Sequence, residues 1–301
     1  MTYVIISPVR NEVQHLGRTI ESVLRQTIRP ERWILVDDGS SDGTGAVADA
    51  AAARCEWIRV IHRRDRGCRK PGGGVVDAFY EGYEQLGPIK WQYLVKLDGD
   101  LSFGPDYFAR CLERFRQHPQ LGIGGGTICK ETDGRLAPES ALDPAFHVRG
   151  ATKMYRRECW EQLGGLIRAP GWDTVDEFKA NMLGWVTYTF PEIQTLHHRP
   201  AGQAQGCWKN WLKNGRANYV AGYHPLFMFV KCLRRLVSRP YGIASAGLGF
   251  GYCGAYLRRV PRVGDAPLIR YVHQQQLRRL MHRESLWAQK SAQPVPAPYA
   301  S

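Results

Sequence analysis

The chain has 301 residues, a net charge of +13 and 44% hydrophobic residues. It is long enough for one large domain with an extension, and apolar enough to build a core. Its 32 glycines and 18 prolines are spread along the chain, which argues against a disordered protein. The eight cysteines form no CxxC pair and no zinc spacing, and the N-terminus lacks the basic start of a signal peptide. We therefore expect reduced thiols and a cytoplasmic protein.

The spacing of apolar residues predicts strands that alternate with helices over the first hundred residues. The expected strands cover residues 3–7, 33–36, 57–61 and 91–97, and the expected helices cover residues 12–26, 46–53 and 75–85. This order predicts an α/β fold with a mostly parallel, Rossmann-like sheet flanked by helices. In such sheets ligands bind beyond the carboxyl ends of the strands.

The second hundred residues continue the alternation with less regular spacing. We expect a helix over 105–117, a Gly-rich strand over 122–129, a strand and a helix within 151–163, a helix over 176–183 and a strand that starts at Gly184.

Two adjacent carboxylates, Asp37 and Asp38, close the second expected strand, and Gly39-Ser40-Ser41-Asp42-Gly43-Thr44 follows them. Adjacent carboxylates repel each other and need compensating donors, such as a base N–H, ribose hydroxyls or a cation. Asp, Ser and Gly also suit a turn and a helix cap. The residues alone therefore leave a ligand site and a structural turn open.

Asp98-Gly99-Asp100 follows the fourth expected strand. Two carboxylates that flank one small residue can bind a hard cation together, and Mg²⁺ and Mn²⁺ prefer oxygen ligands and bring substrate phosphates with them. Gly99 lets the backbone approach a ligand closely. A lone triplet of this kind is common in surface turns, but its place after an apolar strand favours a metal site.

Two further polar clusters lie in the second hundred residues. Asp173, Asp176 and Glu177 lie at the start of an expected helix, where acids either favour the helix dipole or supply a general base over the site. His197 and His198 close the last expected strand. A His at the end of a strand has one of three roles: it is structural, it ligates a metal, or it donates a hydrogen bond to a diphosphate.

Together these segments resemble the inverting glycosyltransferases of family 2, which have the GT-A fold. The segments from Ile6 to Glu12, Ser22 to Gln26 and Val36 to Asp42 are similar to the family's N-terminal signature. Asp98-Gly99-Asp100 falls at the family's DxD motif. The segment from Gly171 to Trp185 aligns with its acidic base motif, with Trp172-Asp173 in place of Glu-Asp.

The resemblance implies a role for each matching position. The nucleotide-sugar site would include Pro8, Arg10, Glu12, Asp37, Asp38, Lys70, Asp98 and Gly99. Asp98, Asp100 and His197 would hold Mn²⁺ or Mg²⁺. Asp173 would be the general base, with Asp176 and Glu177 as alternatives because Trp172 replaces the expected Glu. Lys70 belongs to a cationic loop that either neutralises the diphosphate or is simply solvated.

The resemblance therefore implies metal-dependent, inverting transfer of a sugar from a nucleotide-diphosphate sugar, by family default a UDP-sugar, to an acceptor hydroxyl. The acceptor would be a cell-envelope glycan or a lipid-linked molecule. Two alternatives stay open. One is a non-catalytic nucleotide-sugar-binding protein, which the loss of Glu at Trp172 allows. The other is a sugar nucleotidyltransferase, although no Lys-bearing phosphate loop follows the first strand.

The last quarter of the chain differs in charge from the rest. From Pro225 onward there are 12 Lys or Arg and 2 Asp or Glu. We expect a catalytic domain over residues 1–224, with the nucleotide-sugar half over 1–100 and the acceptor half over 101–224. A basic helical extension over 225–290 and a flexible tail over 291–301 would follow.

The extension joins a basic amphipathic segment, 226–237, to a Gly- and Ala-rich apolar run, 241–256. This pattern predicts peripheral contact with the anionic cytoplasmic face of a membrane. The side chains expected in the lipid are Phe227, Phe229, Val230 and Leu233, and those expected at headgroups are Lys231, Arg234 and Arg235. The apolar run is short for a span. No nucleic-acid partner is expected, because the basic residues do not alternate with stacking aromatics. The alternative is ordinary helices packed on the domain.

Overall fold

The computed structural model describes residues 1–65, 67, 73–132, 134–140, 142–199, 206–237 and 241–289. In this part of the chain one mixed sheet has the strand order β3-β2-β1-β4-β8-β6-β9-β5, and β7 pairs with β6 at its side. The strands are β1 (Tyr3–Val9), β2 (Arg32–Asp37), β3 (Ile58–His62), β4 (Tyr93–Leu97), β5 (Leu101–Phe103), β6 (Leu121–Thr132), β7 (Arg135–Pro138), β8 (Thr152–Arg156) and β9 (Val186–His197).

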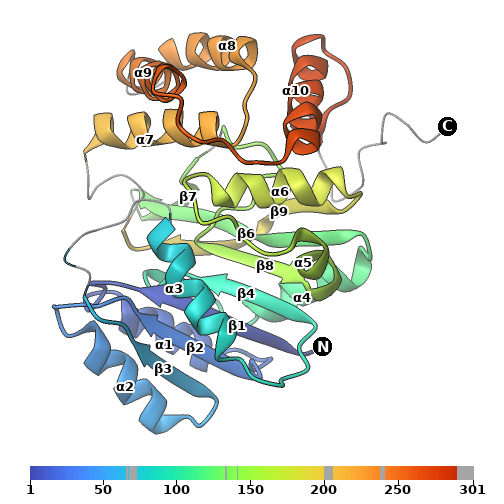
Figure 1. Cartoon of the computed structure of the whole chain (residues 1–301). Helices are drawn as coiled ribbons and strands as arrows, with labels where there is room; N and C mark the ends of the chain where they lie inside the picture. Colours follow the sequence, from blue (N-terminus) through green and yellow to red (C-terminus); the bar gives the residue numbers. More distant parts are fainter. Residues whose placement is uncertain are drawn as a thin grey trace.

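Helices cover both faces of this sheet and gather at one end of the molecule (Figure 1). They are α1 (Leu16–Leu24), α2 (Thr44–Arg54), α3 (Gly73–Glu84), α4 (Tyr107–Gln117), α5 (Arg157–Leu163), α6 (Trp172–Met182), α7 (Cys207–Val220), α8 (Pro225–Leu236), α9 (Ile243–Leu257) and α10 (Ala266–Leu280), with a short 3₁₀ turn at Leu286–Ala288. Helices α1, α2 and α4 cover one face, and α3, α5 and α6 cover the other.

The first half of the chain has the predicted alternation of strands and helices. All seven residues of β1 are buried, and β1 pairs in parallel with both β2 and β4. Strands buried on both faces of a parallel sheet are near-continuous apolar runs, which is why this half is readable from sequence. The second half is mixed, because β8 runs antiparallel to both β4 and β6.

Two helices begin elsewhere than predicted. Helix α1 begins at Leu16 rather than Glu12, because Asn11 has a left-handed backbone (φ 53°) and the next residues form a turn in which the His15 amide donates to the Glu12 carbonyl. Helix α6 begins at Trp172 rather than Asp176. Gly171 has φ 86°, a backbone conformation that glycine adopts easily, and it ends the preceding loop. The helix therefore starts four residues earlier than the apolar spacing indicated.

The last four helices pack onto the sheet domain through a third apolar core. Phe146 and Phe178 from the sheet domain meet Tyr223, Phe227 and Trp287 there. The prediction that Phe227 contacts lipid is therefore wrong: it is 9% exposed, and its ring centroid lies 5.0 Å from that of Trp287. Within the described residues, no helix is both long and apolar enough to cross a bilayer.

Candidate functional site

The first two strands bring the expected nucleotide-site residues to one edge of the sheet. Val9 and Asp37 are partners in the register of β1 and β2. The Asp38 amide donates to the Val9 carbonyl, and the Arg10 guanidinium donates to the Asp38 carbonyl at 2.8 Å. Pro8 is buried within β1. These residues, far apart in sequence, therefore form one continuous rim.

The two carboxylates of this rim have different surroundings. Asp37 accepts from the Ser40 amide at 3.0 Å and faces His62 Nδ1 at 3.3 Å, which is the arrangement of a structural turn. The Asp38 carboxylate lies 2.5 Å from the Arg63 guanidinium. Arg10 also pairs with Asp65 at 2.6 Å. Asp37 thus stabilises the turn that follows β2, and the Asp38 carboxylate lies beside arginine side chains at the rim.

The Asp98-Gly99-Asp100 segment packs on the end of β1. A Cβ added at Gly99 would lie 2.7 Å from Val9 Cγ1, so a side chain there would push the acidic turn off the strand. Lys96, at the end of β4, donates to Asp98 Oδ1 and, at 2.6 Å, to the Gly150 carbonyl. Its side chain is 3% exposed. A buried lysine therefore fixes one of the two carboxylates.

Arg199 joins the acidic turn to the first rim. It donates to Glu12 Oε1, and its Nε lies 3.5 Å from Asp100 Oδ2. The pKa of Glu12 is raised to about 7, mainly by burial and next by the negative charge of Asp100. The positive charge of Arg199 opposes this rise without cancelling it. Glu12 Oε2 and Asp100 Oδ1 are buried oxygens with no hydrogen-bond partner among the described residues.

His197, the last residue of β9, lies beside Asp100. Its Nε2 is 3.4 Å from Asp100 Oδ2, and its Nδ1 is 3.1 Å from Glu139 Oε1. Burial alone would lower the pKa of His197, but its hydrogen bonds to Asp100 and Glu139 outweigh burial and raise it to about 9. Burial alone would raise the pKa of Asp100, but the hydrogen bond from His197 and the charges of His197 and Arg199 outweigh burial and lower it.

These side chains offer part of a cation site. Within the described residues, no three His, Cys, Asp or Glu side chains converge as a complete metal-binding group. Asp100 Oδ1, however, is a buried oxygen that lacks a partner there. A metal-ligating His commonly donates its other ring nitrogen to a carboxylate. Glu139 faces His197 Nδ1 in this way, and a cation at Nε2 would replace the proton that Nε2 shares with Asp100. Asp100 and His197 therefore fit a divalent cation, whereas one oxygen of Asp98 is taken by Lys96.

Asp173 lies next to the acidic turn, although 73 residues separate it from Asp100 in sequence. A Cβ added at Gly150 would lie 2.9 Å from the Trp172 ring and 3.3 Å from Asp173 Cβ. The same Gly150 accepts from Lys96, whose Nζ lies 5.6 Å from the centroid of the Trp172 ring. Gly150, Lys96 and Trp172 thus connect the first turn of α6 to Asp98. The Asp173 side chain is partly exposed.

Asp176 and Glu177 lie inside the protein instead. Lys153 Nζ is 3.0 Å from Asp176 and 2.8 Å from Glu177, and all three side chains are at most 1% exposed. The Tyr155 hydroxyl donates to Asp176 at 2.6 Å, and His147 Nδ1 lies 2.8 Å from Glu177. Burial raises the pKa of Asp176 to about 6 despite Lys153. Both carboxylates are thus engaged within the core.

Several residues of this site had no role in the sequence analysis. Lys96 precedes the acidic turn within an apolar strand, so its position could have suggested a buried partner. Glu139 and Lys153 gave no such signal, because their partners come from distant elements. The expected donor residue Lys70 lies outside the described residues.

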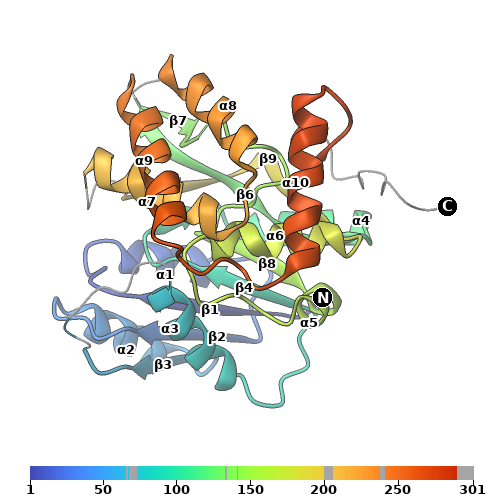
Figure 2. The same ribbon diagram turned by 45° about the horizontal axis from the view of Figure 1, so that its top comes forward.

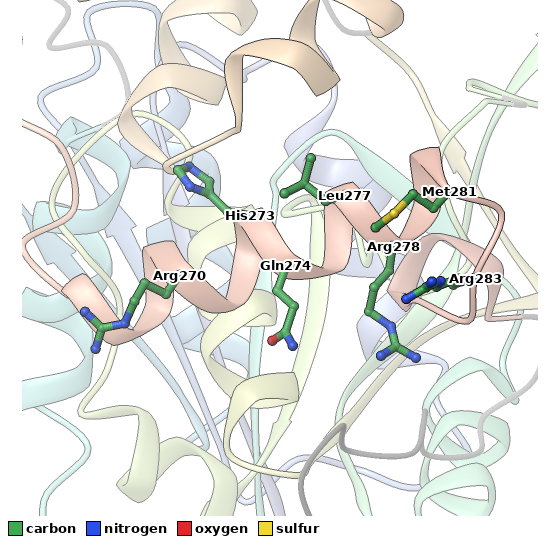
Figure 3. A pocket seen from close by; sticks show the side chains of 7 residues that line it. All are labelled: Arg270, His273, Gln274, Leu277, Arg278, Met281 and Arg283. Carbon is green, nitrogen blue, oxygen red and sulfur yellow. The ribbon is translucent and has the colours of Figure 1, made fainter.

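A separate groove of about 540 Å³ runs along α10. Figure 3 shows the side chains of Arg270, Gln274 and Arg278 on one side of the helix and those of His273 and Leu277 on the other. None of its lining residues belongs to the acidic turn or to the first turn of α6.

Curated relatives match part of this chain. The undecaprenyl-phosphate mannosyltransferase of Micrococcus luteus is 34% identical over 116 residues, which are 38% of this chain and 45% of that protein. The polyprenol monophosphomannose synthase of Mycolicibacterium smegmatis is 33% identical over 175 residues, 53% of this chain and 63% of that protein. The matches thus span about half to two thirds of these relatives.

Solved structures share the fold over most of the chain. A mannosyltransferase of Pyrobaculum calidifontis in complex with GDP-Man and Mn²⁺ has a TM-score of 0.54 at 18% identity, covering 88% of this chain and 76% of that one. TarS 1-349 of S. aureus in complex with UDP has a TM-score of 0.56 at 14% identity, covering 94% and 86%. The fold is therefore of the GT-A type, as expected. A sequence profile described as glycosyl transferase family 2 matches residues 4–168, more than half of the chain. The chain belongs to glycosyl transferase family 2.

Proposed function

We propose that this protein transfers a sugar from a nucleotide-diphosphate sugar, a UDP-sugar by the family's default, to an acceptor hydroxyl with inversion. The observation that supports the proposal is that Asp38 and Asp100 follow β2 and β4, which flank β1 in parallel, while Asp173 packs against Gly150, the acceptor of Lys96 beside Asp98. Ligands of such sheets bind at that edge.

The donor's nucleotide would lie against the rim formed by Pro8, Arg10 and Asp38. Arg10 and Arg63 already hold the Asp38 segment in place. Asp38 would accept from a base N–H or a ribose hydroxyl, and the turn at Asp37 would fix its position. Binding energy from this remote part of the donor orients the anomeric carbon toward the acceptor.

Asp100 and His197 would hold Mn²⁺ or Mg²⁺, with Asp98 at its side. Two protein ligands suffice when substrate phosphates and water complete the coordination. A cation bound there supplies Lewis-acid stabilisation of the charge on the departing nucleoside diphosphate. Glu139 would hold His197 Nδ1, so that Nε2 could lose its proton and ligate the cation, and Arg199 would balance the charge of Glu12.

Asp173 is proposed as the general base in preference to Asp176 and Glu177. Its carboxylate is partly exposed, whereas those two are buried against Lys153. Asp173 would take the proton of the acceptor hydroxyl while that oxygen bonds to the anomeric carbon. The bond from that carbon to the diphosphate oxygen breaks in the same step, which inverts the carbon.

The acceptor is proposed to be lipid-linked or part of a cell-envelope glycan. Two relatives are named for undecaprenyl phosphate and a polyprenol as substrates. A phosphate oxygen is largely deprotonated at neutral pH and needs no base, whereas a hydroxyl does. Removing the Asp173 carboxylate should therefore impair transfer to a hydroxyl acceptor but not transfer to a phosphate acceptor.

The test begins with a thermal-shift panel of nucleotide-diphosphate sugars, with and without Mn²⁺. A ligand at 100 times its Kd stabilises the folded protein by roughly 2.7 kcal/mol. We expect one donor to raise the melting temperature in the presence of Mn²⁺, and Asp100→Ala to remove that rise. The control is Asp106→Asn, at an exposed position beside α4. If no nucleotide sugar shifts the melting temperature with Mn²⁺ present, the donor assignment fails.

Asp173→Asn then separates an enzyme from a non-catalytic nucleotide-sugar-binding protein, the alternative that Trp172 in place of Glu leaves open. We expect the variant to keep the donor-induced shift and to lose transfer by roughly 10²–10⁴-fold in kcat. A wild-type protein that binds donor but neither transfers nor hydrolyses it would favour the binding protein.

A further inference from the structure

Helix α8 presents a continuous apolar stripe to solvent. Leu226, Phe229, Leu233, Leu236 and Val237 are 50%, 61%, 47%, 47% and 80% exposed. Their spacing of three or four residues places them on one side of the helix. The opposite side, with Phe227 and Met228, packs into the third core. The stripe is therefore additional to what folding requires of this helix.

Helix α9 repeats the pattern. Ile243, Ala246, Phe250, Cys253 and Leu257 follow the same spacing and are all exposed. The rings of Phe250 and Trp208 lie 6.0 Å apart, which extends the surface onto α7. Figures 1 and 2 show α7, α8 and α9 together at the end of the molecule opposite β3. We name this surface, defined by the exposed apolar residues of α7, α8 and α9, the apolar cap.

The apolar cap concentrates the exposed apolar surface of the molecule. Of the nineteen large hydrophobic side chains exposed among the described residues, twelve lie between Trp208 and Leu257. Single exposed apolar residues are ordinary, but a concentration of this kind at one end of a molecule marks an interaction surface.

We propose that the apolar cap docks on an anionic lipid bilayer. The region around it is strongly basic, with 12 Lys or Arg and 2 acids from Pro225 onward. Exposed cations adjoin the apolar stripes, among them Lys209, Lys213, Arg258 and Arg259. Apolar side chains between cations match the chemistry of acyl chains beneath anionic headgroups.

A second copy of this chain fits the same surface less well. Packing two apolar caps together would bring two strongly positive regions face to face, and that repulsion opposes association at ordinary ionic strength. An anionic bilayer has the opposite charge. The charge of the region therefore selects the bilayer over a self-association interface.

Docking there would place the proposed base close to the membrane. Gly171, directly before α6, packs against α7, since a Cβ at Gly171 would lie 3.0 Å from the Ala217 carbonyl oxygen. Asp173 lies in the first turn of α6. The benefit for a lipid-linked acceptor rests on the proposed function, whereas docking itself does not.

The test measures flotation of the full chain with vesicles. We expect binding to vesicles of phosphatidylcholine mixed with phosphatidylglycerol, weaker binding to phosphatidylcholine alone, and loss of binding at high salt. The double variant Phe229→Glu with Leu233→Glu should bind at least about tenfold more weakly. The matched control is Leu183→Glu, because Leu183 is 43% exposed, close to the 47% of Leu233, and follows α6. It should bind like the wild type.

Three outcomes would overturn the proposal. The first is wild-type protein that fails to float with anionic vesicles, and the second is a double variant that floats equally well. The third is lipid-free protein that sediments as a dimer which the double variant converts to a monomer. Thermal unfolding confirms that the variants fold, and the donor-induced shift with Mn²⁺ reports the proposed function separately. Either proposal can therefore fail while the other stands.

Discussion

At the scale of single residues, Lys153 is the centre of a buried group of four charges. It lies between Asp176 and Glu177 with its side chain fully buried, and His147 pairs with Glu177 from the other side. Lys153 also donates to the Asp173 carbonyl at 2.6 Å. Two cations thus balance two carboxylates, and the same lysine holds the first turn of α6, where the proposed base lies.

Lys153→Met tests the balance. Removing one partner of a buried ion pair leaves uncompensated charge in the core, which costs roughly 3–5 kcal/mol. We expect a loss of that size in the free energy of unfolding, measured by urea denaturation. The control is Lys179→Met on α6, where a half-buried lysine donates to the Leu163 carbonyl. That change should cost about 1 kcal/mol, and equal losses in the two variants would contradict the charge balance.

His147 should give the stability a pH dependence. Burial alone would lower the pKa of His147, but Glu177 outweighs burial and raises it from 6.5 to about 9. Because the folded-state pKa exceeds the unfolded one, the stabilisation is complete below pH 6.5 and is lost as the pH rises toward about 9. Its full size is up to about 3 kcal/mol.

Urea denaturation at a series of pH values measures this effect. His147→Gln should be less stable than the wild type at pH 6, and its free energy of unfolding should change less between pH 6.5 and 9. Asp176, whose pKa is raised to about 6, titrates below this window, and His197, whose pKa is also raised to about 9, is common to both proteins, so the difference between them reports His147. A wild-type stability that is flat from pH 6.5 to 9 would show that His147 is not held protonated.

The sequence predicted a set of candidate carboxylates but not which of them are buried. Asp173, Asp176 and Glu177 lie within five residues, and their spacing alone gives each a place near the start of a helix. Asp176 and Glu177 differ from Asp173 because their side chains are buried in ion pairs with Lys153 of β8. Long-range partners of this kind leave no local sequence pattern, so the burial of Asp176 and Glu177 could not be predicted from the sequence.

At the scale of elements, the local sequence pattern predicted the strands that precede Asp38 and the Asp98-Gly99-Asp100 segment. Strands β1, β2 and β4 are apolar runs that end at turn residues, and His197 ends β9 as expected. Helix α7 was not predicted, because Gly215 and several Asn residues weaken its local signal. Gly215 is there for a distant contact: a Cβ would lie 2.2 Å from the Leu248 carbonyl oxygen of α9.

The crossing of α7 and α9 gives a matched pair of glycine substitutions. A Cβ at Gly251 would lie 2.1 Å from the Leu212 carbonyl oxygen, whereas a Cβ at Gly254 meets nothing within 4 Å. Gly251→Ala should push the helices apart and cost roughly 1–3 kcal/mol. Gly254→Ala should be neutral or stabilise by up to about 1 kcal/mol through helix propensity.

Thermal unfolding of the two glycine variants, with hydrogen exchange in α7 and α9, measures the difference. We expect faster exchange of both helices in Gly251→Ala and unchanged or slower exchange in Gly254→Ala. Equal effects of the two substitutions would show that backbone contact at Gly251 does not fix the crossing.

At the scale of the whole molecule, the C-terminal helices and the sheet domain share one core. The Trp287 ring lies 5.1 Å from Phe146 and 5.7 Å from Phe178, both in the sheet domain. It also lies 5.0 Å from Phe227 of α8. The expected division at residue 224 therefore crosses a continuous apolar cluster. The composition changes at this residue because the outer faces of α8 and α9 are exposed, whereas their inner faces continue the core.

Trp287→Ala tests whether the two parts unfold together. Truncation of a large aromatic residue in a core costs roughly 3–5 kcal/mol, and the partial exposure of Trp287 places the expectation near the lower figure. Trp208→Ala, at a position 44% exposed, should cost well under 1 kcal/mol. Circular dichroism and hydrogen exchange in β1 and α9 should report one shared transition in the wild type. In Trp287→Ala that transition should shift for both elements, because Phe146 and Phe178 lose the ring that covers them. Separate melting of α9, with β1 unaffected, would mean that the sheet domain is stable without the helices that carry the apolar cap.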